Sequence, residues 1–515
     1  MQEVQSLMEQ LRREILLARE RVYHFGEATP IERLPLSGAG PEIWVKREDV
    51  SLVKSYKWRG ACNRMATLGP GDKKRGVVTA SAGNHAQGVA LAAKSLEVKA
   101  RIYMPLSTPK VKQEAVMQHG GEWVEIRLVG ESYDESVRAA RRDESESAAV
   151  YVHAYDDLRV MAGQGTLADE VVLSGHGPFD AAYLQIGGGG MAAGVGTWLR
   201  SYWPDIRLFG VEGEKQASMQ AAFAAGAPVR LDKVDLFCDG TAVRQVGDLS
   251  YQICKELLDE VQTVSDAEVS HAIRVLWEGL RCISEPSGAM GLAAVLKRRK
   301  ELEGKRVLVV LCGANIDFLQ LGLIAQSQGA SAERGRTLSV RIPEQPGTML
   351  DLLNSCFKEL NIADFQYGKT ANDAAWPLFT LTADDPQALA DLSSLLDAKG
   401  LDWKEIGDAE DVRFRAIALR GDLLSAPAFI RLDFYERPGA LHDFLAQRVQ
   451  GNASLCYFNY RQTGERIGRA LIGLDFPSSF ERDALMMSIP DHGEGYRSCK
   501  LLDESAALRI IGQAG

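Results

Sequence analysis

The chain has 515 residues, of which 46% are hydrophobic and 25% are charged, a composition typical of soluble globular proteins. One hydrophobic core does not normally serve a chain of this length, so two to four domains are expected. The formal net charge of −10 offers no basic surface to nucleic acid, and no apolar run approaches the ~20 residues of a membrane-spanning helix. The sequence therefore predicts neither nucleic acid nor a membrane as a partner.

The N-terminal segment, MQEVQSLMEQLRREILLARE, is charged and has a helical pattern, unlike a secretory signal. The eight cysteines show neither the density of a disulfide framework nor the CxxC spacing of metal sites. We interpret most of them as reduced core residues. These features together predict a cytoplasmic protein without a metal site.

Between about residues 40 and 320, short β-rich runs alternate with Ala-rich helical segments. This alternation predicts α/β architecture with a largely parallel sheet. In such sheets ligands gather where strands end in loops that lead into helices. Three of the runs end in polar or glycine loops, so we expect one site built from three loops. The clearest runs are residues 76–80, 100–105, 181–186, 207–213 and 306–314.

Lys57 is the first residue that indicates chemistry. It lies in SYKWRGA, residues 55–61, between two aromatic residues and at the expected start of a helix. A lysine on the protein surface is the ordinary interpretation of such a residue. A lysine that is desolvated at a positive helix end, however, has a lowered amine pKa, which Schiff-base chemistry requires. Lys57 is therefore a candidate catalytic residue.

The loop SAGNHAQG, residues 81–88, follows the first of these strands. One hydroxyl and three consecutive backbone amides of this loop could form an anion nest for a substrate carboxylate. The alternative is a capped helix start without a ligand. His85 invites a catalytic role, but we interpret it as a structural histidine. The residues of the expected carboxylate site are Ser81, Ala82, Gly83 and Asn84.

Four consecutive glycines, Gly187–Gly190, lie between an apolar strand and an expected helix start. Backbone N–H groups at such a position form a phosphate cradle, although similar glycines also serve as plain tight turns. The P-loop motif GxxxxGK[ST] is not present, and the loop comes too late for a first GxGxxG turn. A phosphate cradle together with an activated lysine indicates pyridoxal 5′-phosphate as the cofactor. The Asn84 amide could then hydrogen-bond its phenolic oxygen.

The pattern changes after residues 327–336, SQGASAERGR, which we interpret as a linker. The segment 338–356 is echoed by 430–447, since each contains an alternating strand, a Pro-Gly turn and the start of a helix. Each continues into an aromatic extended run, at 362–369 and 454–461. A four-residue Pro-Gly echo alone can arise by chance. With its flanking pattern, it predicts two small α/β modules made by duplication.

With these features in hand, the sequence resembles the fold-type II pyridoxal-phosphate enzymes, which share the fold of the tryptophan synthase β subunit. Within them it is similar to the biosynthetic threonine deaminases over essentially the whole chain. The Pro-Gly repeats resemble the paired ACT-like regulatory subdomains of those enzymes. The resemblance implies an α/β catalytic domain followed by two α+β ACT-like modules. The motifs that carry it are KREDVSLVKSYKWRGA, TASAGNHAQGVA, AGQGTLADE, GGGGMAAG, SEPSGA and VLCGAN.

The resemblance assigns roles to matching residues. Lys57 would hold the cofactor through a Schiff base and act as the general base, and Asn84 would contact the ring oxygen. Cys312 falls at the position that faces the pyridine nitrogen, where threonine deaminases usually carry serine. A neutral hydroxyl or thiol cannot hold this nitrogen protonated as a carboxylate would, which favours loss of a β-substituent over transamination. The phosphate would lie against Gly187, Gly188, Gly189, Gly190 and Met191.

The implied reaction is the deamination of L-threonine to 2-oxobutanoate and ammonia, the first committed step of isoleucine biosynthesis, with L-serine as a further substrate. Isoleucine and valine are the implied effectors, and a homotetramer is the implied assembly. The candidates for a regulatory surface are Phe365–Tyr367 and Tyr457–Tyr460, although aromatic strands are commonly plain core. The expected domains are 1–326 (catalytic), 327–336 (linker), 337–408 (first module) and 429–502 (second module).

Two alternatives stay open at this stage. The chain could be another fold-type II lyase or a β-replacement enzyme that acts on serine or a related hydroxy amino acid. The duplicated C-terminal part favours the biosynthetic, regulated type, because other dehydratases and racemases of this family generally lack it. The chain could also be an amino-acid-sensing protein with an inactive catalytic domain. The intact Lys57, Asn84 and glycine loop speak against that second alternative.

Overall fold

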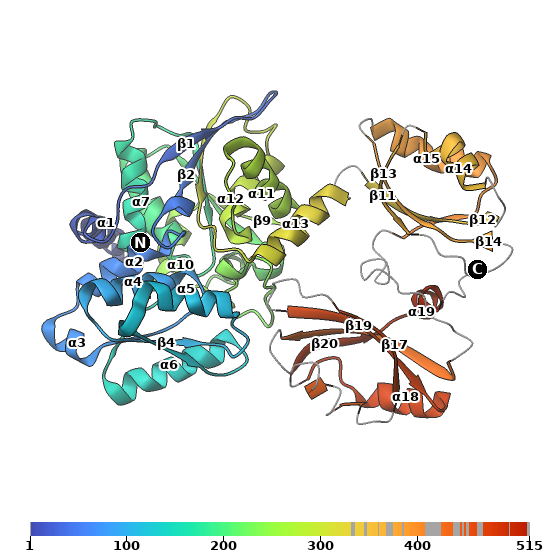
Figure 1. Ribbon diagram of the computed structural model, residues 1–515. Helices are drawn as coiled ribbons and strands as arrows, with labels where there is room; N and C mark the ends of the chain where they lie inside the picture. Colours follow the sequence, from blue (N-terminus) through green and yellow to red (C-terminus); the bar gives the residue numbers. More distant parts are fainter. Residues whose placement is uncertain are drawn as a thin grey trace. The chain divides into compact units, whose positions relative to one another are not determined.

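The chain forms two compact units, Met1–Asp317 and Phe318–Gly515, in the computed structural model (Figure 1). The structure describes residues 2–330, 335–343, 348–358, 360–366, 374–383, 386–406, 424–435, 443–444, 448–449, 453–460, 467–493 and 495–511.

The larger sheet of the first unit has six strands in the order β1-β2-β10-β7-β8-β9. All neighbouring pairs are parallel except β1 with β2. Its central strands β7 and β8 are almost entirely buried, as expected for parallel strands that helices cover on both faces. The strands are β1 (Ile31–Leu34), β2 (Glu42–Arg47), β7 (Ala181–Gln185), β8 (Arg207–Gly213), β9 (Glu260–Val264) and β10 (Arg306–Leu311).

A second, smaller sheet has the strand order β5-β4-β3-β6 and is entirely parallel. The expectation of a single sheet is therefore wrong, because the runs at 76–80 and 100–105 form β3 and β4 of this sheet. The apolar pattern of a strand specifies its burial but not its partner, so the division was not visible in the sequence. The strands are β3 (Val77–Ala80), β4 (Ala100–Met104), β5 (Val124–Leu128) and β6 (Val150–Tyr151).

Helices surround both sheets, and α6 lies on the opposite side of β4 from α4 and α5 (Figure 1). The α-helices are α1 (Gln2–Tyr23), α2 (Lys57–Ala66), α3 (Pro70–Arg75), α4 (Asn84–Leu96), α5 (Lys110–Gly120), α6 (Tyr133–Ser147), α7 (Leu158–Leu173), α8 (Gly190–Tyr202), α9 (Ser218–Ala225), α10 (Asp248–Leu257), α11 (Asp266–Leu280) and α12 (Pro286–Lys297). Short 3-10 helices are η1 (Glu48–Val50), η2 (Gly121–Trp123), η3 (Glu214–Gln216) and η4 (Asp239–Thr241).

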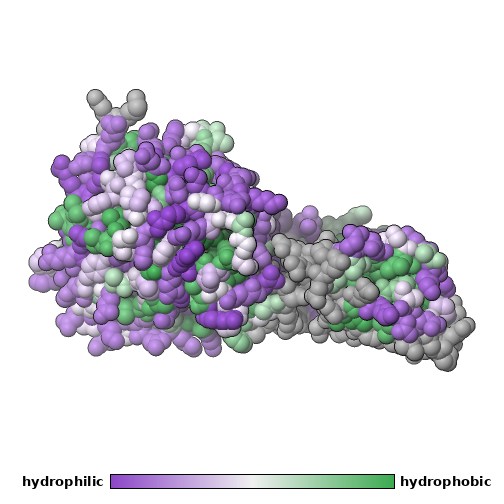
Figure 2. Space-filling model, turned by 90° about the horizontal axis from the view of Figure 1, so that it is seen from above, coloured by the Kyte–Doolittle hydropathy of each residue, from purple (hydrophilic) through white to green (hydrophobic). Residues whose placement is uncertain are grey.

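The apolar side chains of this unit are gathered inside it. One large buried cluster joins residues of α1, α2, α4, α7 and α8 to strands of both sheets. The face of the unit shown in Figure 2 is mostly hydrophilic, with apolar residues in scattered groups, as is usual for protein surfaces. The two sheets therefore share one core, which fixes the loops at their carboxyl ends relative to one another.

Glycines let α2, the helix that begins at Lys57, pack unusually close to α4 and α7. A Cβ on Gly88 of α4 would lie 2.9 Å from the Cα of Trp58. A Cβ on Gly163 of α7 would lie 2.6 Å from the Cα of Gly60. Since no side chain fits at either contact, these glycines fix the position of α2.

A buried ionic cluster anchors α2 from the side of the larger sheet. Arg59 is fully buried and donates to the carboxylates of Glu48 and Glu170 at 2.5–3.1 Å. Lys46 of β2 also pairs with Glu170, so two cations balance two anions. Loss of one partner of a buried pair leaves an uncompensated charge and costs ~3–5 kcal/mol. The cluster thereby ties α2 to β2, η1 and α7.

The second unit contains two antiparallel four-stranded sheets, with the orders β13-β15-β11-β16 and β18-β19-β17-β20. When the four strands of each sheet are numbered along the chain, the spatial order in both sheets is second, third, first and fourth, which supports the duplication inferred from the sequence; β12 and β14 pair separately. The first module and the helix before it contain α13 (Phe318–Ala330), β11 (Gly335–Val340), β12 (Ile342–Pro343), α14 (Thr348–Cys356), β13 (Asn361–Gln366), β14 (Ala374–Ala375), β15 (Leu378–Thr382), α15 (Pro386–Ala398) and β16 (Trp403–Glu405). The second contains β17 (Ala426–Tyr435), β18 (Ser454–Tyr460), β19 (Ile467–Phe476), α18 (Ser479–Ser488), β20 (Tyr496–Leu501) and α19 (Glu504–Ile510).

Several sequence features of this unit fall partly outside the described residues. The expected linker 327–336 is the end of α13 up to residue 330 and strand from Gly335 onward. Its centre, 331–334, lies outside the described residues, as do both Pro-Gly turns, 344–347 and 436–439.

Tyr457 of β18 is a core residue, whereas Phe458 and Asn459 are partly exposed, so a regulatory surface at Tyr457–Tyr460 stays a prediction. The Tyr457 ring is buried and packs edge-on against Phe429, with the ring centroids 6.0 Å apart. Ile510 of the C-terminal helix belongs to the same cluster. The sequence did not show that this distant helix covers the aromatic strand. Of the other candidate segment, Phe365 belongs to β13 and Tyr367 lies outside the described residues.

Candidate active site

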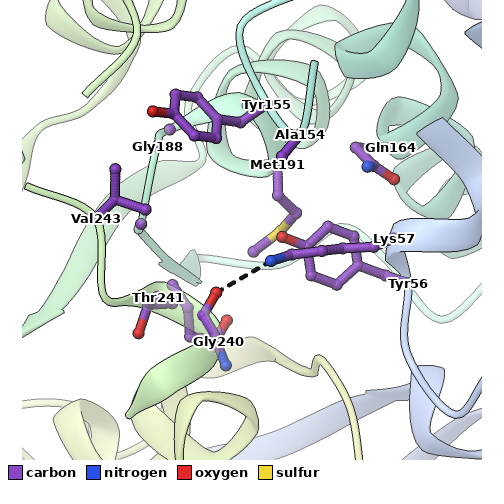
Figure 3. Close-up of a pocket in the computed structure, with 14 residues that line it drawn as sticks. Tyr56, Lys57, Ala154, Tyr155, Gln164, Gly188, Met191, Gly240, Thr241 and Val243 are labelled. Carbon is purple, nitrogen blue, oxygen red and sulfur yellow. Dashed lines mark hydrogen bonds between the residues drawn. The ribbon is translucent and has the colours of Figure 1, made fainter. Parts of the chain in front are cut away.

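A pocket in the first unit brings Lys57 and the glycine loop together (Figure 3). About 400 Å³ of space that no protein atom fills, part of it open to solvent, lies between the lining residues. Segments that are distant in the sequence form its wall, so the pocket exists only in the folded chain. The lining residues are Tyr56, Lys57, Ala154, Tyr155, Gln164, Gln185, Gly187, Gly188, Gly189, Gly190, Met191, Gly240, Thr241 and Val243.

The glycine loop joins β7 to α8 and is packed too closely to carry side chains. A Cβ on Gly188 would lie 2.1 Å from the Tyr155 ring, and one on Gly190 would lie 2.4 Å from the Tyr155 carbonyl oxygen. Gly189 is the N-cap of α8 with φ of +93°, a conformation that favours glycine. Among the described hydrogen bonds, none joins the N–H groups of Gly187, Gly188 or Gly189 to a protein acceptor. These N–H groups at a helix start have the chemistry of a phosphate cradle.

Lys57 begins α2 and directs its amine into the same pocket (Figure 3). Its Nζ donates to the carbonyl oxygen of Gly240 at 3.0 Å. Burial lowers the pKa of Lys57, and the negative charges of Glu285 and Asp239 oppose this lowering. A desolvated amine that is held by one carbonyl oxygen can act as a nucleophile or as a base.

The loop from Ser81 to Asn84 lies between β3 and α4, next to the pocket wall but not part of it. The Ser81 Oγ accepts the N–H of Gly83 at 3.3 Å, so the hydroxyl is engaged within the loop. A Cβ on Gly83 would meet no atom within 4 Å, so open space adjoins these amides. The side chain of Asn84 is oriented from two sides, since its Nδ2 donates to Glu285 and its Oδ1 accepts from Asn315, each at 2.7 Å.

Glu285 is a buried carboxylate beside the site that the sequence analysis did not single out. It precedes α12, and its Oε1 accepts from the Nδ2 of Asn84 and, at 3.2 Å, from the Oγ of Ser287. Burial raises its pKa, and the charge of Lys57 and the hydrogen bond from Asn84 oppose that increase. The available signal was the SEPSGA motif, in which the glutamate stands immediately before a helix that begins with proline.

Cys312 follows β10 and is buried beside the segment that carries Lys57. Its carbonyl oxygen accepts the N–H of Tyr56 at 3.1 Å. Burial raises the pKa of its thiol, and the charges of Glu285 and Glu48 raise it further. The thiol is therefore neutral near pH 7, which is the property that its predicted role requires. Its contact with a pyridine nitrogen stays a prediction.

His85 agrees with the structural interpretation. The residue is buried in α4, and its Nε2 lies 3.1 Å from the carbonyl oxygen of Val152. A carbonyl oxygen only accepts, so this nitrogen carries the proton. Burial lowers the pKa of His85 to about 3, and the imidazole is neutral near pH 7.

Metal ligands, membrane spans and disulfides bear on the class of the protein. Within the described ranges, no group of three or more His, Cys, Asp or Glu side chains is placed to hold a metal ion. In the part of the chain that the structure covers, no helix is long and apolar enough to cross a membrane. All eight cysteines are free, in agreement with their interpretation as reduced core residues.

The residues of the pocket fit pyridoxal phosphate, a cofactor with a phosphate and an aldehyde. The glycine loop offers unpaired N–H groups and a backbone that no Cβ obstructs. Lys57 offers an amine whose pKa is lowered. A phosphate site and an amine in one pocket match the two functional groups of this cofactor.

Each of the two sheets of the first unit, with the helices around it, forms one lobe. This two-lobed α/β fold and the pocket define a pyridoxal-phosphate-dependent enzyme. The family model described as pyridoxal-phosphate dependent enzyme matches residues 22–313. The model of the C-terminal regulatory domain of threonine dehydratase matches residues 424–507. Together with the relatives below, these matches show that the chain belongs to the biosynthetic threonine dehydratases, which are fold-type II pyridoxal-phosphate lyases.

Similar proteins cover most of the chain. The biosynthetic L-threonine dehydratase of Burkholderia multivorans is 36% identical over 459 residues, which are 87% of this chain and 90% of the relative. The enzyme of the same name from Escherichia coli is 34% identical over 89% of each chain. Among solved structures, processed threonine deaminase isoform 2 from Solanum lycopersicum is 35% identical with a TM-score of 0.58, covering 62% of this chain and 93% of that one. The resemblance stated from the sequence is thereby confirmed.

Proposed function

We propose that the pocket binds L-threonine next to Lys57 and deaminates it to 2-oxobutanoate and ammonia, the first committed step of isoleucine biosynthesis. The observation that carries this proposal is the presence of Lys57 and the four-glycine loop in one pocket. Similarity to threonine dehydratases across the catalytic and regulatory parts supports it. L-serine, which lacks only one methyl group, is a proposed second substrate of the same site.

Pyridoxal phosphate, when bound, supplies an electron sink that makes the Cα proton of an amino acid removable. In the proposed arrangement, the Nζ of Lys57 holds the aldehyde carbon. The backbone N–H groups of Gly187–Gly190 and Met191 hold the phosphate at the start of α8.

Polar residues from other elements would set the orientation of the cofactor ring. Asn84 would contact the ring oxygen, with its amide oriented by Glu285 and Asn315. Cys312 would face the pyridine nitrogen as a neutral partner. A neutral partner would leave this nitrogen unprotonated, which favours loss of the β-hydroxyl over transamination.

Lys57 is the proposed general base that removes the Cα proton. The amine must be unprotonated to do so, and burial lowers its pKa, which increases the neutral fraction at a given pH. The carbonyl of Gly240 accepts one N–H of Nζ at 3.0 Å. The lone pair of a neutral amine is therefore not directed at Gly240.

The substrate carboxylate is proposed to lie on the loop between β3 and α4. The open space beside Gly83 supports this placement, because a ligand can approach the loop amides there. An anion at this position also lies near the N-terminus of α4, which stabilises negative charge. The proposed contacts are Ser81, Ala82, Gly83 and Asn84.

The C-terminal unit is proposed to make the enzyme responsive to the pathway product, with isoleucine as inhibitor and valine opposing it. The match to a regulatory domain supports this role. The proposed division is 1–326 for catalysis, 327–336 as linker, and 337–408 and 429–502 for regulation. Control of this kind requires tighter binding of isoleucine to a low-activity state, typically by ~1–3 kcal/mol.

A homotetramer in the cytoplasm completes the proposal. Eight free cysteines support a reducing compartment.

A product assay tests the proposed function. The purified, cofactor-loaded protein is incubated with L-threonine and with L-serine, each with and without isoleucine or valine, and the 2-oxo acids are measured. We expect 2-oxobutanoate from L-threonine and inhibition by isoleucine, with the Lys57→Ala variant as the blank. A loaded protein that forms no 2-oxo acid from either amino acid would overturn the proposal.

A further inference from the structure

A long loop of the larger lobe forms one side of the pocket. Residues 226–247, here named the pocket loop, connect α9 to α10, and within them the structure shows one regular element, the three-residue helix η4. Loops longer than ~12–15 residues without secondary structure are uncommon in compact domains and are usually functional. The pocket loop contributes Gly240, Thr241 and Val243 to the pocket wall.

One ion pair attaches this loop to the opposite lobe, directly beside the pocket. Asp239, which precedes Gly240, pairs with Lys112 of α5. Helix α5 packs against helix α4 and against strand β5 of the smaller sheet, so the Lys112–Asp239 ion pair joins the two lobes. The Lys112 and Asp239 side chains are only 16% and 19% exposed, so solvent and salt screen the pair less than a surface pair.

A second set of ion pairs fixes the ends of the same loop. Asp134 of α6, also on the smaller sheet, pairs with both Arg230 and Arg244. The N–H of Leu231 donates to the carbonyl oxygen of Arg244 at 2.8 Å, which holds the two arms of the loop together. These arginines are 52% and 39% exposed, whereas the pair of Asp239 adjoins the reacting amine. We therefore infer that the ends of the pocket loop anchor it to the smaller lobe, whereas its centre, around Asp239, belongs to the active site.

The backbone at Gly240 is enclosed between Lys57 and α12. Its carbonyl oxygen accepts the Nζ of Lys57 at 3.0 Å (Figure 3). On the other side, a Cβ on Gly240 would lie 2.3 Å from the Oγ of Ser287. The Gly240 backbone therefore has little free space beside Ser287, and it directly follows Asp239 in the chain.

We propose that Asp239 is a positioning residue, whose ion pair with Lys112 holds the Gly240 carbonyl on Lys57 and so orients the general base. This inference rests on the proposed role of Lys57. The carboxylate of Asp239 also raises the pKa of Lys57 against the effect of burial. Replacement of Asp239 consequently acts on both the position and the titration of the amine.

The test compares Asp239→Asn, Lys112→Asp and the charge-swapped double variant Lys112→Asp/Asp239→Lys with the parent holoenzyme. For Asp239→Asn we expect kcat for L-threonine to fall ~10- to 100-fold, the loss typical of a misplaced catalytic group. Bound cofactor content should be unchanged, because the phosphate cradle is intact. The double variant should recover at least tenfold relative to Lys112→Asp. Glu144→Gln is the matched control, since Glu144 forms an ion pair with Arg141 on the same lobe but away from the pocket.

A spectroscopic measurement makes the test independent of the substrate. The absorbance band of the Lys57-bound cofactor is titrated with pH, and Asp239→Asn should move its transition to lower pH, because one nearby negative charge is lost. An unchanged transition in Asp239→Asn, or a double variant without recovery, would overturn the inference. Absence of 2-oxobutanoate with the parent, together with the expected shift, would contradict the proposed substrate and support the role of Asp239.

Discussion

Gly188→Ala is expected to weaken cofactor binding through a steric clash at a defined place. A Cβ at this position would lie 2.1 Å from the Tyr155 ring. The ring is restrained, because the Tyr155 hydroxyl donates to the carbonyl oxygen of Gln245 at 3.3 Å. The glycine loop, rather than the ring, must therefore move. Movement of the loop displaces the N–H groups that are proposed to hold the phosphate.

The size of the effect follows from the cost of overpacking, which is ~1–3 kcal/mol in a well-packed region. Since about 1.4 kcal/mol corresponds to a tenfold change in affinity, the dissociation constant should rise ~5- to 150-fold if this cost falls on the bound state. The assay is a titration of the cofactor-free protein with pyridoxal phosphate, followed by absorbance.

Gly322→Ala is the matched control, because a Cβ on this exposed residue of α13 would meet no atom within 4 Å. It should leave the dissociation constant unchanged. A dissociation constant for Gly188→Ala within twofold of the parent would refute the assignment of this loop to the phosphate.

Four further predictions concern the chemistry, the regulation and the stability. Lys57→Ala should lower 2-oxobutanoate formation by at least ~10²-fold, the lower end of the usual ~10²–10⁴-fold contribution of a general base, and a smaller loss would contradict the role. Cys312→Ser should keep most of the elimination rate. Cys312→Asp should protonate the ring nitrogen and increase transamination relative to elimination. An unchanged ratio of the two reactions in the Asp variant would show that Cys312 does not face the ring nitrogen. Truncation after Gly329 should preserve deamination of L-threonine and abolish inhibition by isoleucine, and persistent non-competitive inhibition would place the effector site in the catalytic unit. Unfolded His85 takes up a proton below pH ~6.5 but the folded residue does so only at about 3, so stability falls as the pH drops through this window; His85→Gln should flatten that slope in chemical-denaturation curves.

The local parts of the site could be predicted from the sequence because their chemistry is encoded in consecutive residues. A strand that ends in four glycines specifies a tight turn, a helix start and free N–H groups without reference to the rest of the chain. The placement of Lys57 at the first position of α2 followed from the same kind of local pattern.

The missed parts depend on residues that meet only in the folded chain. Glu285 touches Asn84, and Asp239 pairs with Lys112, and neither contact has a local signature. The Gly240 carbonyl, which holds Lys57, is a backbone group that no side-chain motif could indicate.

The fold shows the same division between local and distant information. The strand runs were placed well, as β8 (Arg207–Gly213) illustrates, because continuous apolar runs specify buried strands. Their partition into two sheets was missed, because pairing is a property of two strands. The burial of Tyr457 depends on distant residues in the same way, since Ile510 of the C-terminal helix belongs to the same buried cluster.

The most direct test of the Schiff base on Lys57 is to reduce the purified holoprotein with borohydride and to map the modified peptide by mass spectrometry. Borohydride converts a Schiff base between a lysine and pyridoxal phosphate into a stable amine. We expect one phosphopyridoxyl group per chain, on Lys57. A group on Lys54 or on any other lysine, or a protein that carries none after incubation with the cofactor, would contradict this expectation.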